Sequence, residues 1–446
     1  MNTTSSNGKI SQNKGSIISS ILVTRTINKI ARKSQYLQRR RGKISPKNLV
    51  IGFMIMVSRK RNTYADWAKE IGLLEDQTIT RQAINERMNT QTECFIKAFI
   101  EQQLSQKIKD RPSQKLKGVL KNFKSIKIDD STILSLPDEL AGAFPGNVSG
   151  GIKKSQAKIH AMYNLTKNNF SFLKVYSFSN NDQSLSQNVL PYLQAGDLCI
   201  RDLGFSTFGA IEKFNHQGIY FIARKNYNNK IYDLDSEKEI DILKEIGKSP
   251  FLDKEVLLGK QKLKARLVVV KLPDEQANQR KRKAKEDRDR RTNHTLNYYK
   301  LLSYSIYISN IPTEKCNVNQ IAELYRLRWR IEIIFKSWKS CFSIENILHN
   351  QCKNIIRVNC VIYLMLLYIY LFHVIWWQNV KKKMQLIDKH IQLSIIKLSH
   401  FFQQHFTQIF YSELNEQVIM QIRCHCTYDK RKDRKNAVDY YLSMAA

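Results

Sequence analysis

The residues between positions 325 and 339 carry charged side chains at a spacing that could form a catalytic or binding site. At roughly 100° per residue, a helix through this segment aligns five side chains along one stripe: Tyr325, Arg328, Glu332, Lys336 and Lys339. The stripe sets one carboxylate among three cations and a phenol. In one interpretation Glu332 only pairs with its neighbours one turn away, and each such pair contributes roughly 0.2–0.5 kcal/mol. In the other interpretation the stripe is a functional site.

A second stripe on the same helix explains how the helix packs. It lies about 120° round from the first and is apolar. Its members are Leu324, Leu327, Ile331, Ile334 and Trp338. We therefore expect one helix that is buried along this side and carries the charged stripe beside it.

The spacing Tyr325-x2-Arg328-x3-Glu332-x6-Lys339 resembles the YREK signature of DDE transposases of the insertion-sequence-4 type. The resemblance implies that Glu332 is the third of three metal-binding carboxylates. It also implies that Tyr325, Arg328 and Lys339 hold phosphates at the transposon end, with Lys336 adding charge near the bond that is cut. Two more acids should then lie upstream, each at the end of a strand.

Two aspartates match the remaining motifs of that family. Asp130, followed by Ser-Thr, resembles the first, and Asp202 in the segment Asp-Leu-Gly-Phe resembles the second. Asp129 competes with Asp130, but strand alternation makes the two face opposite ways, and Asp130 directly precedes the Ser-Thr pair. Either acid alone reads equally well as a loop or cap residue. A glycine two residues after Asp202 suits a backbone that turns sharply as it leaves a strand.

The elements that must position these acids follow from the hydrophobic pattern. A helix is expected over 184–193, and strands are expected over 123–136, 158–165, 170–178, 197–200 and 220–224. Three meandering strands followed by helix, strand, helix and strand form the order of an RNase H-like fold. The predicted fold class is α/β, with an RNase H-like core built on a mixed five-stranded sheet, a β-rich insertion, and helical N- and C-terminal regions.

The expected domain organisation has four parts. Residues 1–19 form a disordered tail, 20–113 a helical DNA-binding domain, 114–339 the catalytic core, and 340–446 a helical region for core packing and possible dimerisation. The core is interrupted by the insertion, 226–301. The insertion carries a basic run at 280–291 that is either a solvated face or a phosphate contact.

A helix-turn-helix is predicted over 63–88. Thr63 and Asp66 would form a capping box, and the second helix would start near residue 80. Arg81, Gln82, Asn85 and Arg87 would lie on its DNA-reading face. An ordinary helical hairpin is the alternative.

Some relatives stack a flipped base on a Trp in the insertion, but this chain has no Trp between Trp67 and Trp329. Tyr298 or Tyr299 could replace it, and the use of a hairpin intermediate stays open.

The net charge of +34, from 73 Lys and Arg against 39 Asp and Glu, implies a polyanionic partner. Double-stranded DNA is the first candidate and an anionic membrane the second. The apolar stretch 358–377 is long enough to cross a bilayer. It is interrupted by Asn359 and His373, and a helix buried inside a large protein has the same composition, so a core helix without a membrane is the preferred interpretation.

Three converging carboxylates can hold two divalent cations roughly 3.5–4 Å apart, and Mg²⁺ is expected because all the ligands are oxygens. The predicted function is a cut-and-paste DNA transposase that acts on DNA as a homodimer, in the cytoplasm at the nucleoid. The alternatives are a catalytically silent DNA-binding regulator derived from a transposase and a basic membrane-associated protein.

Overall fold

A computed structural model describes residues 16, 18–38, 43–109, 118–225, 229–286, 295–349, 354–388, 391–412 and 414–428. The chain divides into two compact units. Among the described residues, the first unit holds those up to Glu101 and those from Ser337 onward, and the second holds Gln102 to Lys336. The helices at the two ends of the chain thus share one unit, and the whole sheet lies in the other.

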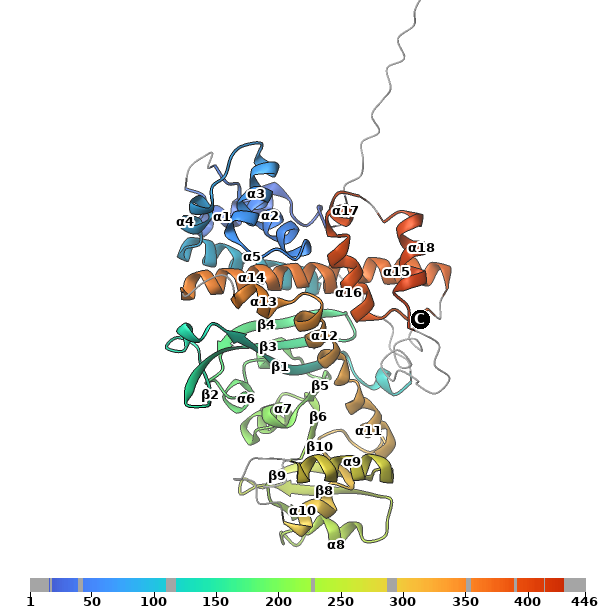
Figure 1. Cartoon of the computed structure of the whole chain (residues 1–446). Helices are drawn as coiled ribbons and strands as arrows, with labels where there is room; N and C mark the ends of the chain where they lie inside the picture. Colours follow the sequence, from blue (N-terminus) through green and yellow to red (C-terminus); the bar gives the residue numbers. More distant parts are fainter. Residues whose placement is uncertain are drawn as a thin grey trace, which may run out of the picture. The chain divides into compact units, whose positions relative to one another are not determined.

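The second unit is built on one sheet of ten strands (Figure 1). The strand order is β2-β3-β1-β5-β6-β10-β9-β8-β7, and β4 also pairs with β3. The bounds are β1 Ile126–Leu136, β2 Pro145–Ser149, β3 Ile152–Asn164, β4 Asn169–Ser177, β5 Leu198–Arg201, β6 Tyr220–Arg224, β7 Ile231–Asp233, β8 Phe251–Leu258, β9 Leu263–Lys271 and β10 Tyr304–Ser309.

Five of these strands form the expected RNase H-like core, in the order β4-β3-β1-β5-β6. The pairs β1–β3 and β3–β4 are antiparallel, whereas β1–β5 and β5–β6 are parallel. Strand β5 ends at Arg201, beside Asp129 in the middle of β1, and β1 continues to Leu136 along β3. Asp202 therefore follows the end of its strand as expected, whereas Asp130 lies in mid-strand and not at the strand end predicted from the sequence.

The sheet is wider than the five strands predicted from the sequence. Strand β10 pairs with β6, and β9 of the insertion pairs with β10, so that the insertion continues the sheet. A core strand left at the edge would expose unpaired backbone groups, and the insertion covers it. The insertion is also less β-rich than expected, because it contains helices as well as strands.

Helices α7 (Phe208–His216) and α11 (Val318–Arg326) cover opposite faces of this sheet. Ile306 and Ile308 of β10 belong to the same buried cluster as Phe214 of α7. Tyr307, between them, has its ring 5.1 Å from that of Tyr325 at the end of α11. Since successive side chains of a strand point to opposite faces, the two helices lie on different sides.

The predicted helix 184–193 does not form as one element. Helix α6 ends at Leu185, and a separate 3-10 turn follows at Leu190–Tyr192. Pro191 in that turn has no backbone N–H to donate into an α-helix. The helices of the second unit are α6 Asp182–Leu185, α7 Phe208–His216, α8 Ile242–Ile246, α9 Asp274–Lys285, α10 Leu296–Leu301 and α11 Val318–Arg326, with 3-10 turns η1 Gly118–Asn122, η2 Asp138–Leu140, η3 Leu190–Tyr192 and η4 Leu203–Phe205.

The first unit is helical in its described parts, apart from one isolated bridge between Leu393 and Thr427. Its helices are α1 Thr24–Lys33, α2 Pro46–Ser58, α3 Tyr64–Glu75, α4 Arg81–Arg87, α13 Ile344–His349, α14 Ile355–Tyr370, the π-helical segment η5 Leu371–Trp376, α15 Trp377–Ile387, α16 Ile395–Gln404, α17 Phe406–Tyr411 and α18 Glu416–His425. Helices α5 Thr90–Lys109 and α12 Trp329–Ser340 each run from one unit into the other.

The long apolar helix over α14, η5 and α15 packs inside the first unit. Among the described residues it is the one helix long and apolar enough to cross a membrane, and 89% of its most apolar window is buried. Its His373 is buried, and Nε2 of His373 accepts a hydrogen bond of 3.3 Å from Nε1 of Trp338. This burial is what the core-helix interpretation predicts.

Candidate active site

Asp130 lies in the middle of β1, one residue beyond the last residue of β1 that pairs with β5. Its Oδ1 accepts a hydrogen bond of 2.8 Å from the backbone N–H of Ser131, and its side chain is 14% exposed. The neighbouring Asp129 is fully buried on the opposite face of the strand. Asp130 is therefore the member of the pair that can reach a ligand from outside.

Asp202 follows β5 directly and is 43% exposed. The Leu203–Phe205 turn begins after it, and Gly204 lies where that turn approaches Asp182. A Cβ on Gly204 would lie 2.9 Å from Oδ2 of Asp182. The expected reason for this glycine was a sharp turn of the backbone, but the structure gives a different one: the glycine provides space for the side chain of Asp182.

The segment 325–339 is not the single helix that its spacing predicts. Helix α11 ends at Arg326 and α12 begins at Trp329, so Tyr325 lies on one helix and Glu332 on the next. The apolar stripe remains buried across this break, since all five of its members are at most 1% exposed. The apolar side chains are buried both before and after the turn, so their burial does not require a continuous helix.

Arg328, in the turn between the two helices, brings the three candidate acids together. Its Nη1 lies 2.8 Å from Oδ2 of Asp130, and its Nη2 donates to Oε1 of Glu332. Its Nε lies 3.9 Å from Oδ1 of Asp202, which also accepts a hydrogen bond of 3.3 Å from the hydroxyl of Tyr325. Segments about 70 and 130 residues apart in the chain thus converge on one guanidinium.

Burial shifts the pKa values of this cluster. It raises the pKa of Asp130 to about 7, although Arg328 lowers it, and it raises the pKa of Glu332 against the same opposing charge. Burial would lower the pKa of Arg328, but Tyr325 and the surrounding carboxylates raise it above its usual value. Burial likewise raises the pKa of Tyr325, whose hydroxyl therefore stays protonated at neutral pH.

The donor set fits a divalent cation. Within the described part of the chain, no three His, Cys, Asp or Glu side chains lie close enough together to hold a metal ion as they are placed. The three carboxylates instead surround a guanidinium, which provides the positive charge among them. Carboxylate oxygens are the ligands that hard cations such as Mg²⁺ prefer. An ion at this site would take over the partners of Arg328.

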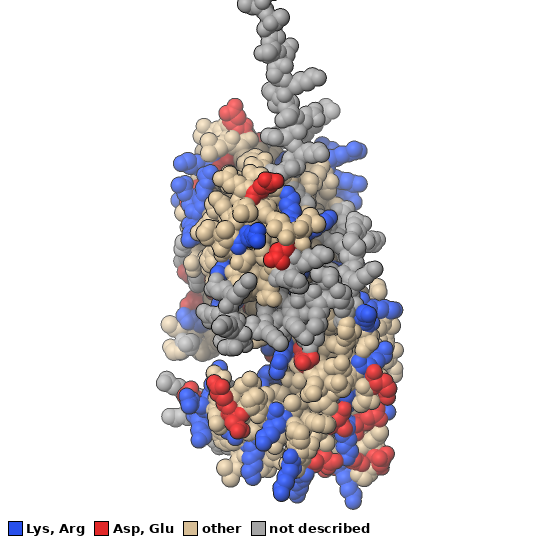
Figure 2. Space-filling model, turned by 90° about the vertical axis from the view of Figure 1, so that its right-hand side faces the viewer, with Lys and Arg blue, Asp and Glu red and all other residues tan. Residues whose placement is uncertain are grey.

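A basic cleft of about 540 Å³ adjoins the carboxylates. It lies between β9, β10, α9 and α11, and Glu332 and Arg328 are part of its wall. Its further lining includes Arg224, Lys271, Arg280 and Arg326, together with Trp329, whose side chain is 64% exposed. Basic side chains are also distributed over both units on the face drawn in Figure 2, with fewer acidic ones among them.

The other predicted DNA contacts belong to α12 and to the first unit. Lys336 is exposed on α12, and Lys339 belongs to the first unit, where its ammonium lies 3.8 Å from Glu345. The two helices predicted over 63–88 are present as α3 and α4. Thr63 caps α3 through the backbone N–H of Asp66, at 3.1 Å, and Thr80 caps α4.

Of the predicted reading face on α4, Arg81 and Gln82 are exposed and Asn85 is half-buried. Gln82 also borders a cavity of about 780 Å³ in the first unit. Arg87 instead packs its guanidinium over the ring of Tyr36, 5.3 Å from its centroid. Part of the basic run at 280–291 forms the end of α9, and the positions from 287 on lie outside the described residues.

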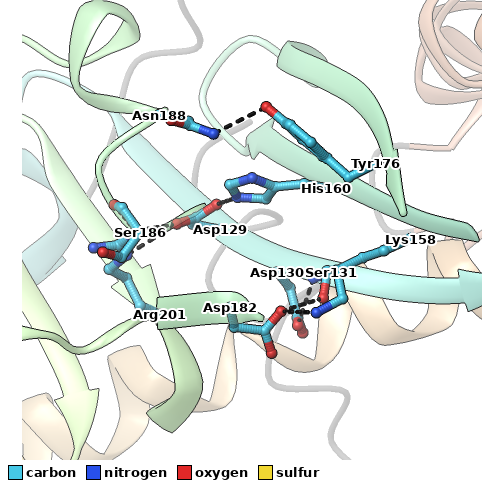
Figure 3. Close-up of polar contacts among 10 residues, drawn as sticks. All are labelled: Asp129, Asp130, Ser131, Lys158, His160, Tyr176, Asp182, Ser186, Asn188 and Arg201. Carbon is cyan, nitrogen blue, oxygen red and sulfur yellow. Dashed lines mark hydrogen bonds and ion pairs between the residues drawn. The ribbon is translucent and has the colours of Figure 1, made fainter. Parts of the chain in front are cut away.

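A fourth carboxylate beside the site was not predicted from the sequence. Oδ1 of Asp182, at the start of α6, accepts hydrogen bonds of 3.0 Å from Ser131 and 2.9 Å from Lys158 (Figure 3). The position of Ser131 directly after Asp130 was the available signal, since a polar residue there needs a partner.

Comparison with known proteins shows which sequences this chain resembles. The family model for the transposase DDE domain matches residues 121–371, which is more than half of the chain. The transposase for insertion sequence element IS231F of Bacillus thuringiensis subsp. israelensis is 27% identical over 89% of this chain and 86% of its own length.

Two further relatives are closer in identity over shorter regions. The transposase for element IS231C of Bacillus thuringiensis subsp. berliner is 30% identical over 72% of this chain and 70% of its own length. The transposase for element IS1151 of Clostridium perfringens is 30% identical over 76% of this chain and 75% of its own length.

Proposed function

The chain belongs to the DDE transposases of the insertion-sequence-4 type, and on that premise we propose that Asp130, Asp202 and Glu332 hold two magnesium ions for cut-and-paste transposition. Enzymes of this family are DNA transposases that depend on divalent metal ions. The observation that carries the assignment is the guanidinium of Arg328, around which these three carboxylates gather. Carboxylates that gather around one positive charge are suited to hold another.

The bound ions would activate water, and later a DNA 3′-hydroxyl, for in-line attack on a phosphodiester, and would stabilise the leaving oxygen. The protein supplies the positions. Asp130 and Asp202 come from neighbouring parallel strands, and Glu332 from the first turn of α12. In the absence of DNA the hydroxyl of Tyr325 donates to Asp202.

Positive charge near the site would hold the transposon end. Arg328 would pass from the carboxylates to a backbone phosphate once the ions take its partners. Lys336 and Lys339 would add phosphate contacts along the DNA, and Tyr325 would position one phosphate. The basic cleft beside Glu332 supports a path for the DNA on that side.

Recognition of the element's ends is assigned to α4. Arg81, Gln82 and Asn85 lie on a short helix that follows a tight turn, in the manner of a helix-turn-helix. The DNA-bound form would be a homodimer that pairs two ends, and its place of action would be the cytoplasm at the nucleoid, where the substrate lies.

The test is cleavage of the element's own end DNA with magnesium. Asp130→Ala, Asp202→Ala and Glu332→Ala should each reduce cleavage to the background rate, because each removes a ligand that the other two cannot replace. Binding of end DNA in calcium, measured by gel shift, should stay within about threefold of wild type, since phosphate contacts supply most of the affinity.

Calcium titration without DNA provides the matched measurement. Each alanine variant should lose calcium affinity, whereas Glu323→Ala, on α11, should retain it. Cleavage by any one of the three variants at more than a tenth of the wild-type rate would remove that residue from the site.

A further inference from the structure

A buried ionic cluster lies behind the candidate active site. The carboxylate of Asp129 accepts a hydrogen bond of 2.6 Å from Nε2 of His160 and two from Arg201, 2.9 Å from Nε and 2.6 Å from Nη2 (Figure 3). All three side chains are at most 1% exposed. They belong to β1, β3 and β5, so the cluster crosses three neighbouring strands.

Stability alone does not account for this cluster. Replacing a buried ion pair by apolar residues of similar volume is often neutral or stabilising, because burial of charge is costly. The cluster is also incompletely satisfied: Nδ1 of His160 and Nη1 of Arg201 are buried without a hydrogen-bond partner among the described residues. A network of this kind is better suited to fixing one geometry than to adding stability.

The cluster lies where geometry matters for the three acids. Asp129 directly precedes Asp130, and Arg201 directly precedes Asp202. In the parallel pairing of β1 with β5, Asp129 opposite Arg201 is the last pair of residues. Beyond that pair no backbone hydrogen bonds among the described residues join β1 to the segment that follows β5. The side-chain contact between Arg201 and Asp129 joins the two strands at this point.

Phe205 extends the cluster into the Asp-Leu-Gly-Phe segment. Its ring is fully buried and stacks on the imidazole of His160, with centroids 4.7 Å apart. The guanidinium of Arg201 lies over the same ring at 5.6 Å. The turn after Asp202 is thus anchored to two members of the cluster, His160 and Arg201.

We propose that Asp129, Arg201 and His160 are positioning residues that fix the separation of Asp130 and Asp202 and thereby set the affinity of the site for its divalent ions. The proposal rests on the proposed function of those two carboxylates. Groups that hold metal ligands in place typically change metal affinity by about 10–100-fold when they are replaced.

The same two strands carry a matched control at their other ends. Asp197, just before β5, accepts hydrogen bonds of 2.7 Å from Ser125 and 2.6 Å from Lys127 of β1, and the side chains of this ion pair are at most 9% exposed. This second buried ion pair also joins the two strands, but at the ends where they begin. Its loss should destabilise the unit without moving the acids.

The experiment compares Asp129→Asn with Asp197→Asn in the full-length protein. Calcium affinity is measured by calorimetry, and the magnesium concentration that gives half-maximal cleavage is measured at a temperature where circular dichroism shows both variants folded. Asp129→Asn should weaken calcium binding at least about tenfold and raise the magnesium requirement in parallel, with most of the maximal rate recovered at saturating magnesium. Asp197→Asn should lower the melting temperature. It should leave the calcium dissociation constant and the magnesium concentration for half-maximal cleavage within about twofold of wild type.

A second pair of variants covers the case in which Asp129→Asn does not fold. His160→Gln retains a donor toward Asp129 and should keep calcium affinity near that of wild type. His160→Leu lacks the donor and should lose affinity. If both His160 variants melt lower but bind calcium as wild type does, the cluster is merely structural and the proposal is overturned.

The failure of the proposed function would look different. In that case calcium binding would survive Asp130→Ala, or wild type would show none. If Asp130→Ala abolishes calcium binding while Asp129→Asn and His160→Leu leave it unchanged, only the positioning role is refuted.

Discussion

Arg328 relieves repulsion among the acids that surround it. Its guanidinium contacts Asp130 and Glu332 directly and lies near Asp202. Its own side chain is 15% exposed, so solvent screens these contacts only in part. At an effective dielectric constant of about 20, two unit charges 4 Å apart attract each other by about 4 kcal/mol before the cost of removing them from water is subtracted. A divalent ion has to compete with this cation.

Arg328→Ala should therefore bind calcium more tightly in the absence of DNA. We expect a gain on the order of tenfold, which corresponds to about 1.4 kcal/mol of competition removed, as measured by calorimetry. The same variant should bind end DNA in calcium about 10–100-fold more weakly, because a charge-assisted hydrogen bond to phosphate contributes about 1.5–3 kcal/mol. Arg328→Lys keeps the charge and serves as the control. Unchanged calcium affinity in Arg328→Ala would show that the guanidinium does not compete with the ion.

The pKa of Asp130 gives metal binding a dependence on pH. Burial raises this pKa to about 7, so the carboxyl is largely protonated below neutral pH. A protonated carboxyl is a poor ligand, and calcium affinity should rise as the pH increases from 6 to 8 and then level off. The folded protein binds this proton more tightly than the unfolded chain, so the contribution of Asp130 to stability decreases over pH 4 to 7. Calorimetry of wild type and Asp130→Asn between pH 4 and 8 measures both the calcium affinity and the stability. The Asn variant should lack the rise in calcium affinity with pH.

At the scale of elements, the turn between α11 and α12 changes how the site works. A continuous helix would hold Tyr325, Arg328 and Glu332 along one line, whereas the break places Tyr325 beside Asp202 and Arg328 between the three acids.

The role of α3 and α4 does not follow from their geometry alone. Two helices of this length and spacing can serve DNA recognition or only pack, and mutation must separate these roles.

Substitutions on α4 should separate phosphate contacts from base contacts. Arg81→Gln should reduce the slope of log affinity against log salt by about 1, as expected for one lost phosphate contact. Gln82→Ala and Asn85→Ala should instead reduce discrimination between end DNA and random DNA by about 1–3 kcal/mol, the range for a base-edge contact.

Lys69→Gln is the matched control, because Lys69 is an exposed cation on α3 and its loss changes the net charge by the same amount. Fluorescence anisotropy on both DNAs over a range of salt supplies all of these values. If the Lys69 and Arg81 variants change the salt dependence of DNA binding equally, α3 and α4 form an ordinary helical hairpin and not a DNA-reading motif.

At the scale of the whole molecule, the net charge of +34 dominates the encounter with DNA. Basic side chains occur on both units, so the attraction does not depend on one small patch. Released counterions make such binding strongly dependent on salt.

Affinity for random DNA should therefore fall steeply between 50 and 200 mM salt. A protein that makes about 6–10 phosphate contacts loses about 10³–10⁵ in affinity over this range. Gel shift or anisotropy with a fixed DNA length measures the slope. A slope close to zero would contradict a phosphate-dominated interface.

Several features of this protein follow from the order of its residues alone. Apolar runs predict β1, β4, β5 and β6 to within about three residues of their observed bounds, whereas β3 begins at Ile152, well before its predicted start at residue 158. The acids Asp130 and Asp202 could be found from the residues that follow them, Ser-Thr and Leu-Gly-Phe, although only Asp202 lies at the end of a strand. The buried stripe that includes Trp338 could be predicted because its apolar residues recur at the spacing of one helix face.

Tertiary structure decided what depends on contacts between distant segments. The partners of Asp129 are 31 and 72 residues away in the chain, so the sequence offered no sign that the less favoured aspartate lies at the centre of a buried network. The break after Arg326 was hidden because both helices obey one periodicity, and the pairing of β9 with β10 that widens the sheet depends on an edge that exists only after folding. Local pattern determines which residues are buried or exposed, and only the folded chain determines which charged groups meet.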